Sequence, residues 1–186
     1  DKDTSGLIVV AKNNYSHAGL GKQFSDHSIK RKYIALVWGV LRPLKGTIET
    51  FLTRSKRNRQ LMIADEFKGK KAITRYSIVK VFIKKNIPKI SLIEFDLKTG
   101  RTHQIRAHMM YKGTSLLGDQ KYRKKNLKFK NIDKKFEKIL FSLKGQVLHA
   151  HTLGFIHPRS NKKVEFKTKI PSNFKKLVDY LENLKN

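Results

Sequence analysis

Hydrophobic and polar residues alternate with a period of two along several stretches of this chain, a pattern typical of half-buried β-strands. The alternation is clearest in Ala72–Phe82 and Ile90–Leu97, with a turn expected around Asn86–Pro88 between them. Two shorter apolar runs, Leu7–Ala11 and Tyr33–Val40, contain several β-branched residues, and we expect both to form buried strands.

The carboxyl-terminal part of the chain predicts one more hairpin and a closing helix. Val147–His157 and Val164–Lys169 are its expected strands, with Pro158–Asn161 at the turn. After Pro171, apolar residues recur with helical spacing and therefore share one face; they are Phe174, Leu177, Val178 and Leu181.

Two further helices are expected earlier in the chain. Asn13 and Asn14 offer N-cap oxygens for a helix over about Ser16–Asp26. Thr102–Tyr111 has the character of a short helix, and Gly113 follows as a residue suited to end it. Because strands outnumber helices and mostly follow one another directly, the pattern predicts an α+β domain with a mainly antiparallel sheet.

Turn residues and basic stretches mark the connections. Thr53–Arg59 is a basic loop, which is either a solvated connector or a loop whose Arg57 and Arg59 contact phosphate. Lys121–Lys135 holds many lysines between sparse apolar residues, and we expect it to be a flexible surface insertion. The turns after the Tyr33–Val40 strand are marked by Gly39, Pro43 and Gly46.

The net charge of the chain indicates which class of partner it favours. Forty-two Lys and Arg residues against 14 Asp and Glu residues give a net charge of +28, which favours association with a polyanion such as nucleic acid. A general bias toward lysine would explain part of this excess but not the scarcity of acids. No apolar run approaches the roughly 20 residues of a membrane-spanning helix. The absence of cysteine excludes disulfides and suits a reducing cytoplasm.

The first six residues, DKDTSG, place two carboxylates directly before an apolar run. A carboxylate on such a turn can face a cleft and still be held rigidly, because Thr4 and Ser5 can bond the turn backbone and Gly6 accepts unusual backbone angles. The same residues also suit an ordinary Asx-type turn without function. The segment by itself leaves this choice open.

A second polar cluster, GRTHQIR at residues 100–106, follows a predicted strand and opens a predicted helix. Helix N-termini attract anions through their free N–H groups and dipole. The spacing of Arg101, His103 and Arg106 brings their side chains to one end of that helix. This junction is therefore a candidate to hold a phosphate or to pair with a carboxylate, although a plain surface helix would carry the same charges.

Several motifs together resemble one known family. DKDTSGLIVVAKN is similar to the central portion of HRLDxxTSGLLLLAKN, a motif of the RluA-type pseudouridine synthases. The similarity continues in the same order in KRKYIALVWGVL (30–41), GRTHQIRAHM (100–109), LLGDQKY (116–122) and LHAHTLGFIHP (148–158). The closing KIPSNFKKLVDYL resembles that family's final helix. Five motifs in order over almost the whole chain make this resemblance specific.

The resemblance implies isomerisation of selected uridines in structured RNA to pseudouridine. It assigns the catalytic carboxylate to Asp1 and an active-site tyrosine to Tyr33. Arg106 matches the basic residue that pairs with the carboxylate. We expect a bent, mainly antiparallel mixed sheet flanked by helices, with a central basic cleft that holds these three side chains together. The expected RNA-contacting residues are Lys2, Arg57, Arg59, Arg101 and His103.

The family needs no metal or organic cofactor, so none is expected here. His149 lies inside a family motif and is expected to be structural together with His151. The H-R-L triplet that precedes the aspartate in the family is absent, so we expect residues 1–186 to be an N-terminally truncated catalytic domain without an S4-like domain. The expected partner of this cytoplasmic monomer is ribosomal RNA or transfer RNA.

Two other classes of function compete with this interpretation. A noncatalytic basic RNA-binding module would explain the charge without a reaction, and it predicts that Asp1 is dispensable. A nuclease or glycosidase is the weaker alternative, because the sequence offers neither an acidic metal-binding cluster nor a convincing second catalytic carboxylate.

Overall fold

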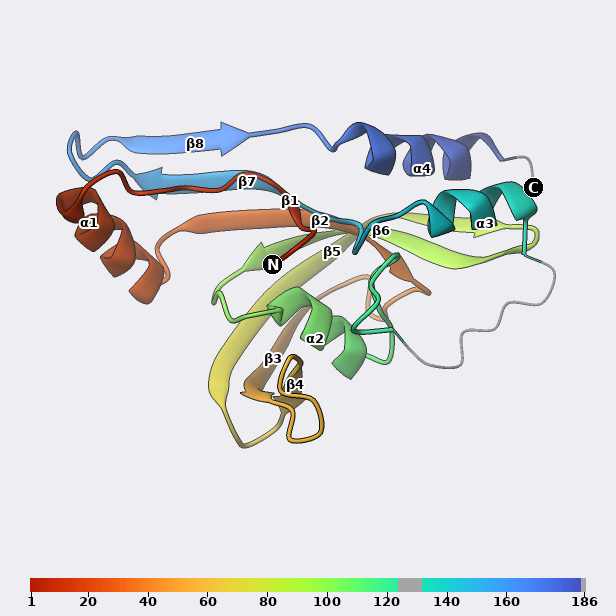
Figure 1. Ribbon diagram of the computed structural model, residues 1–186, viewed down its shortest axis with the longest axis horizontal. Helices are drawn as coiled ribbons and strands as arrows, with labels where there is room; N and C mark the ends of the chain where they lie inside the picture. Colours follow the sequence, from red (N-terminus) through yellow and green to blue (C-terminus); the bar gives the residue numbers. More distant parts are fainter. Residues whose placement is uncertain (124–131, 185–186) are drawn as a thin grey trace.

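The computed structural model describes residues 1–123 and 132–184 (Figure 1). The strands of this part of the chain are β1 (Ser5–Gly6), β2 (Lys30–Trp38), β3 (Lys45–Arg54), β4 (Met62–Asp65), β5 (Lys70–Lys84), β6 (Ile87–Leu97), β7 (Leu148–Ile156) and β8 (Lys163–Lys167). The helices are α1 (Asn14–Ser25), α2 (Gln104–Tyr111), α3 (Lys134–Phe141) and α4 (Ser172–Asn183).

The strands form one sheet in the order β1-β7-β2-β6-β5-β3-β4, with β8 also paired to β7. Every pairing is antiparallel except that of β1 with β7. The sheet curves strongly, and α2 lies on the opposite side of it from α3 and α4 (Figure 1). The predicted α+β class, with a bent and mainly antiparallel mixed sheet, is confirmed.

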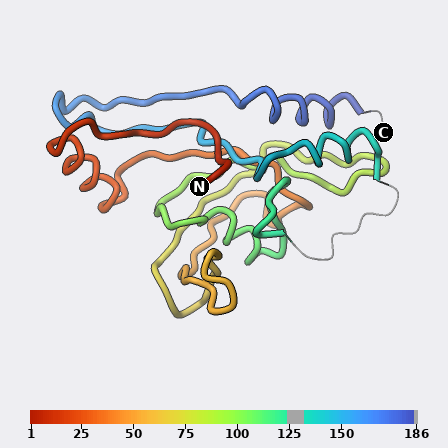
Figure 2. The backbone as a smooth tube through the Cα atoms, in the orientation of Figure 1, coloured from red at the N-terminus to blue at the C-terminus, as the bar shows by residue number. Residues whose placement is uncertain are grey.

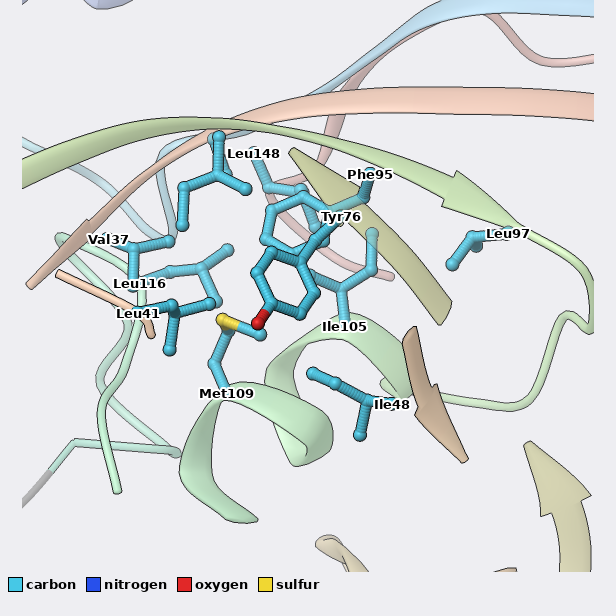
Figure 3. Close-up of a cluster of buried hydrophobic side chains, with 12 residues drawn as sticks. Val37, Leu41, Ile48, Tyr76, Phe95, Leu97, Ile105, Met109, Leu116 and Leu148 are labelled. Atoms are coloured by element: carbon cyan, nitrogen blue, oxygen red, sulfur yellow. The ribbon is translucent and has the colours of Figure 1, made fainter. Parts of the chain in front are cut away.

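Alternate residues of the central strands enter two hydrophobic clusters on opposite faces of the sheet. On one face, Val37 of β2 joins a cluster with Ile105 and Met109 of α2 (Figure 3). On the other face, Leu36 packs with side chains of α3 and α4, which are Phe136, Phe174, Leu177, Val178 and Leu181. Burial on both faces explains why β2 is a nearly continuous apolar run.

Several local expectations are confirmed. Asn13 caps α1, because its side chain accepts a hydrogen bond from the Ser16 N–H at 2.8 Å. Gly113 follows α2 with a φ of 75°, the left-handed backbone that favours glycine. The closing hairpin forms from β7 and β8, and α4 buries the four apolar residues of its predicted face.

The prediction of a buried strand at Leu7–Ala11 is wrong. Within the described residues, the backbone of this segment is hydrogen-bonded to β7 only at Leu7, whose N–H donates to the Ala150 carbonyl at 2.9 Å, and Ile8 and Val10 are 85% and 73% exposed. One edge of β7 pairs with β2. The other edge is shared by β1 and β8, and β8 occupies Thr152–Ile156. No edge of β7 is left for this apolar run.

The strand β3 was not predicted, and Gly46 lies inside it rather than at a turn. Its buried residues, Ile48, Thr50 and Leu52, alternate with residues that are exposed or half-buried. Gly46 packs against the ring of Tyr76 on β5, where a Cβ would come within 3.0 Å of the hydroxyl oxygen. The glycine therefore allows the two strands to approach rather than breaking one of them.

The expected insertion at Lys121–Lys135 is only partly as predicted. Residues 124–131 lie outside the described residues. Tyr122 is buried, at 2% exposure, and Lys134 begins α3. Both ends of the stretch therefore belong to the packed domain.

A buried histidine of α2 predicts a pH dependence of the stability of the protein. His108 lies between the hydroxyls of Thr50 and Thr74, at 3.1 and 2.8 Å, and burial lowers its pKa to about 4. The unfolded chain binds the proton near pH 6.5, so stability is lost as the pH falls from there to 4, by on the order of 3 kcal/mol. Urea unfolding of wild type and His108→Gln, at about pH 6.5 and about pH 4, measures this loss of stability. The expected result is a smaller loss for the variant, and equal losses would contradict it.

Candidate active site

The backbone of the first residue, Asp1, lies in the middle of the molecule and not at its edge (Figure 2). A carboxylate oxygen of Asp1 is 3.6 Å from Nη1 of Arg106. The segment around Asp1 is held by Gln146, which precedes β7. The Gln146 side-chain amide donates to the Lys2 carbonyl and to the Thr4 hydroxyl. Because a buried amide and the β1–β7 pairing hold the backbone, the Asp1 side chain is positioned although it is 20% exposed.

Arg106 is the buried centre of this site. It lies on α2 and is held through two hydrogen bonds to Asp119, from Nε at 2.7 Å and from Nη2 at 2.9 Å. This planar, two-bond pairing is the strongest that an arginine makes with a carboxylate. It fixes the guanidinium so that Nη1 remains directed at Asp1.

Asp119 itself is held by the turn that follows α2. Its side chain is fully buried, and one oxygen accepts hydrogen bonds from the N–H groups of Lys121 and Tyr122, both at 3.0 Å. Gly118 precedes it with a φ of 74°, and a Cβ there would collide with the Gly145 carbonyl. The turn LLGDQKY thus presents a carboxylate rigidly to Arg106.

His103 and Tyr122 form the wall next to Arg106. The Arg106 guanidinium lies 4.8 Å from the centre of the Tyr122 ring. The Tyr122 hydroxyl accepts from the Met62 N–H at 2.7 Å, so its own proton is free to be donated to Nδ1 of His103 at 2.9 Å. Burial, followed by the charges of Arg106 and Lys121, lowers the pKa of His103, which favours the neutral ring. His103 is therefore suited to contact a substrate rather than to supply a permanent charge.

Gln104 ties the strand-to-helix junction to the sheet. Its side-chain oxygen accepts from the Thr99 hydroxyl at 2.7 Å and from the Arg101 N–H at 2.9 Å. Its amide group donates to the Thr74 hydroxyl and the Ile73 carbonyl of β5. The start of α2, and with it the position of Arg101 and His103, depends on this buried amide.

Tyr33 lies across the pocket from α2. It follows an irregularity in the β2–β7 pairing and is partly buried. Burial raises the pKa of its hydroxyl. A pocket of about 80 Å³ brings it together with Asp1; the other lining residues are Thr4, Leu97, Arg101, His103, Gln104, Ile105 and Leu148.

The structure thus brings Asp1, Tyr33 and Arg106 together as expected, with Arg101 and His103 in the same pocket. The Arg101 side chain also donates to the Lys71 carbonyl at 2.9 Å. Lys2 is exposed directly beside Asp1.

Two of the expected RNA-contacting residues are not brought to this pocket. Arg57 and Arg59 are exposed on the loop between β3 and β4, and neither lines it. The Arg59 carbonyl accepts a hydrogen bond from Nη1 of Arg54, at the end of β3, at 2.9 Å.

Sequence reasoning missed three residues of this site: Gln104, Asp119 and Tyr122. All three stand in motifs that were recognised, but none was given a role. The signal for Asp119 was an isolated acid after a glycine in a chain with few acids. His149 accepts or donates a hydrogen bond with the Ser5 hydroxyl at 2.9 Å, which joins β1 to β7.

Within residues 1–123 and 132–184, no three His, Cys, Asp or Glu side chains form a group suited to hold a metal ion. In the same part of the chain, no helix is long and apolar enough to span a membrane.

The chain matches one protein family. The family model described as RNA pseudouridylate synthase matches residues 1–111. The chain is 45% identical over 185 residues to ribosomal large subunit pseudouridine synthase D of Zymomonas mobilis, and 40% identical over 181 residues to an uncharacterized RNA pseudouridine synthase of Bacillus subtilis. The chain therefore belongs to the RNA pseudouridylate synthase family, which confirms the resemblance seen in its motifs.

These alignments cover 97% of this chain but 54% of each relative, so the chain spans about half the length of the curated relatives it matches. The fold agrees with solved structures of greater sequence distance. Human RNA pseudouridylate synthase domain containing 4 superposes with a TM-score of 0.73 at 20% identity, covering 98% of this chain and 73% of the human one. This similarity shows the shared fold.

Proposed function

We propose that this chain carries the active site of an RNA pseudouridine synthase, with Asp1 as the catalytic carboxylate. The observation that carries the proposal is the pairing of Asp1 with the buried Arg106, 3.6 Å apart, next to Tyr33 in a member of this family. The permanent charge of Arg106 stabilises the carboxylate charge that the reaction needs. Arg106 can do so because Asp119 holds it in position.

The proposed reaction is an isomerisation. The bond between N1 of uracil and C1′ of the ribose breaks, the base turns over, and C5 bonds to C1′. C5 loses its proton and N1 gains one, so atoms and electrons balance without an oxidant or reductant. Asp1 beside the ribose either forms a covalent bond to the sugar or removes a proton from it, and both roles require an ionised carboxylate.

The proposed substrate is structured RNA, with large-subunit ribosomal RNA ahead of transfer RNA. The net charge of +28 favours a polyanion. The name of the Zymomonas mobilis relative specifies the ribosomal large subunit. A stacked uridine has to leave its helix to reach a carboxylate in a pocket, at a cost of about a few kcal/mol that contacts to the RNA backbone offset.

The test is a chemical map of pseudouridines in total RNA from cells lacking the gene. We expect one or a few sites to be lost, and to be restored by the full-length protein but not by its Asp1→Ala form. The lost positions identify the RNA. An unchanged map, with purified full-length protein inactive on the same RNAs, would instead support a noncatalytic RNA-binding module.

Tyr33 is proposed to stack on the target base and to supply a proton through its hydroxyl, which its raised pKa keeps protonated. Tyr33→Phe keeps the ring and removes the proton. We expect wild-type RNA affinity with a rate about a hundredfold lower, measured in single-turnover assays. The control is Tyr76→Phe, which removes a core hydroxyl bonded to the Pro43 carbonyl and leaves the rate unchanged. A Tyr33→Phe rate equal to wild type would restrict Tyr33 to stacking.

A further inference from the structure

Arg31 is a buried arginine, and two of its side-chain nitrogen atoms form no hydrogen bond within the described residues. It lies on β2, two residues before Tyr33, and is only 8% exposed. Its Nε and Nη2 atoms are buried and form no hydrogen bond within the described part of the chain. None of the ion pairs in residues 1–123 and 132–184 involves Arg31. A buried charged group whose N–H groups form no hydrogen bond is unfavourable, so a ligand that accepts from Arg31 would offset this cost.

The surroundings of Arg31 make its charge more unfavourable in the free protein. Burial lowers the pKa of Arg31 most; Tyr33 and Asp96 raise it, and the like charge of Arg101 lowers it, so that the pKa is lowered on balance. The ring of Phe24 lies 5.6 Å from its Cζ atom. An aromatic face offsets part of the charge but supplies no hydrogen-bond acceptor for the guanidinium N–H groups.

A second pocket, of about 140 Å³, opens beside this guanidinium. Tyr33 lines both this pocket and the one that holds Asp1, so the two adjoin. Besides Arg31 and Tyr33, the walls are mostly apolar; they are formed by Leu7, Ile8, Val9, Phe24, Ala150, Thr152 and Leu153. An apolar wall strengthens any charge-assisted hydrogen bond made inside it.

The glycine of GRTHQIR leaves room for Arg31. A Cβ at Gly100 would overlap Nη1 of Arg31. The guanidinium therefore lies against the backbone that leads into Arg101 and His103. The motif that contributes Arg106 to the site thus also makes space for Arg31 on the other side of Tyr33.

We propose that Arg31 binds a backbone phosphate of the RNA next to the target uridine, in the pocket behind Tyr33. A phosphodiester supplies acceptor oxygens that match the planar fork of a guanidinium, and a net charge of +28 brings such a polyanion to the protein. This inference rests on the proposed function, because it takes RNA as the ligand. It adds a residue that holds the flanking backbone while Asp1 faces the ribose.

The test compares Arg31→Met with Lys85→Met in the full-length protein. Lys85 is exposed at the turn between β5 and β6, at the other end of the sheet, and serves as the matched control. The probe is a hairpin transcript with uridines in its loop, and binding is measured against salt concentration. For Arg31→Met we expect about 10-fold to 100-fold weaker binding, and a salt slope reduced by about 0.7 to 0.9, the value of one phosphate contact.

Thermal unfolding of the free proteins separates binding from a structural role. We expect the melting temperature of Arg31→Met to equal or exceed that of wild type, because the substitution removes a buried charge whose N–H groups form no hydrogen bond. Gly100→Ala, which displaces the guanidinium, is expected to weaken RNA binding without adding to the effect of Arg31→Met in the double variant.

A variant Arg31→Met that melts lower but keeps the wild-type affinity and salt slope would overturn the inference. Failure of the proposed function has a different signature, because wild-type protein would bind the transcript and form no pseudouridine in any RNA. The salt slope reports on Arg31 in either case.

Discussion

Replacing Asp1 by Asn in the full-length protein is expected to lower pseudouridine formation by at least about a hundredfold to ten-thousandfold, while RNA binding is kept. Asn has nearly the same shape as Asp but cannot carry the negative charge that faces Arg106, 3.6 Å away. The measurement is the single-turnover rate at saturating RNA, together with the dissociation constant of the same RNA.

Asp3→Asn is the matched control for this prediction. Asp3 lies two residues further on, in the same turn, and has a φ of 69°. Asn tolerates this left-handed backbone as well as Asp does, so the turn is preserved. We expect Asp3→Asn to have the wild-type rate. If Asp1→Asn shares that rate, the carboxylate is not catalytic and the noncatalytic RNA-binding module becomes the better interpretation.

Replacing Asp119 by Ala is expected to lower the free energy of unfolding by about 3 to 5 kcal/mol, the largest effect on stability that we expect from a single change. The change leaves the buried charge of Arg106 with only the more distant Asp1 beside it. It also removes the acceptor of the Lys121 and Tyr122 N–H groups. Urea unfolding measures this loss directly.

Asp119→Asn separates the charge from these turn hydrogen bonds, because its amide oxygen can still accept from both N–H groups. We expect the rate of pseudouridine formation per folded molecule to fall, since the guanidinium that faces Asp1 is no longer held by a charged partner. Asp179→Asn is the control: it breaks the exposed Lys175–Asp179 pair on α4, and such pairs contribute about 0 to 1 kcal/mol. Wild-type stability and rate in Asp119→Asn would show that Arg106 is positioned without Asp119.

Local patterns predicted most elements of the fold. These patterns depend on residues that lie within a few positions of each other. They are the alternation in β5 and β6, the cap at Asn13, the glycine after α2 and the apolar face of α4. Strand β3 was missed because most of its exposed residues are charged, at Lys45, Glu49 and Arg54, and because Gly46 near its start is typical of a turn. Its role depends on pairing with β5.

The candidate site was predicted in part, through motifs rather than geometry. Asp1, Tyr33 and Arg106 were chosen by resemblance to the family, and the structure places them together. The role of Asp119 follows from its contact with Arg106, which lies 13 residues earlier in the chain. The hydrophobic periodicity around Asp119 and around Arg106 does not predict that contact.

The sequence by itself determined the family, the polyanion-favouring charge, and the helices and strands whose signals are local. The tertiary structure decided which segment pairs with a given strand edge and which charged side chains lie next to each other. Leu7–Ala11 is as apolar as a buried strand, yet β8 occupies the edge of β7 that it would need. Arg106 pairs with Asp1 and Asp119, whereas Arg31 forms no ion pair within the described residues and lines a pocket. Pairings of this kind join distant segments, so they are set by the packing of the whole domain.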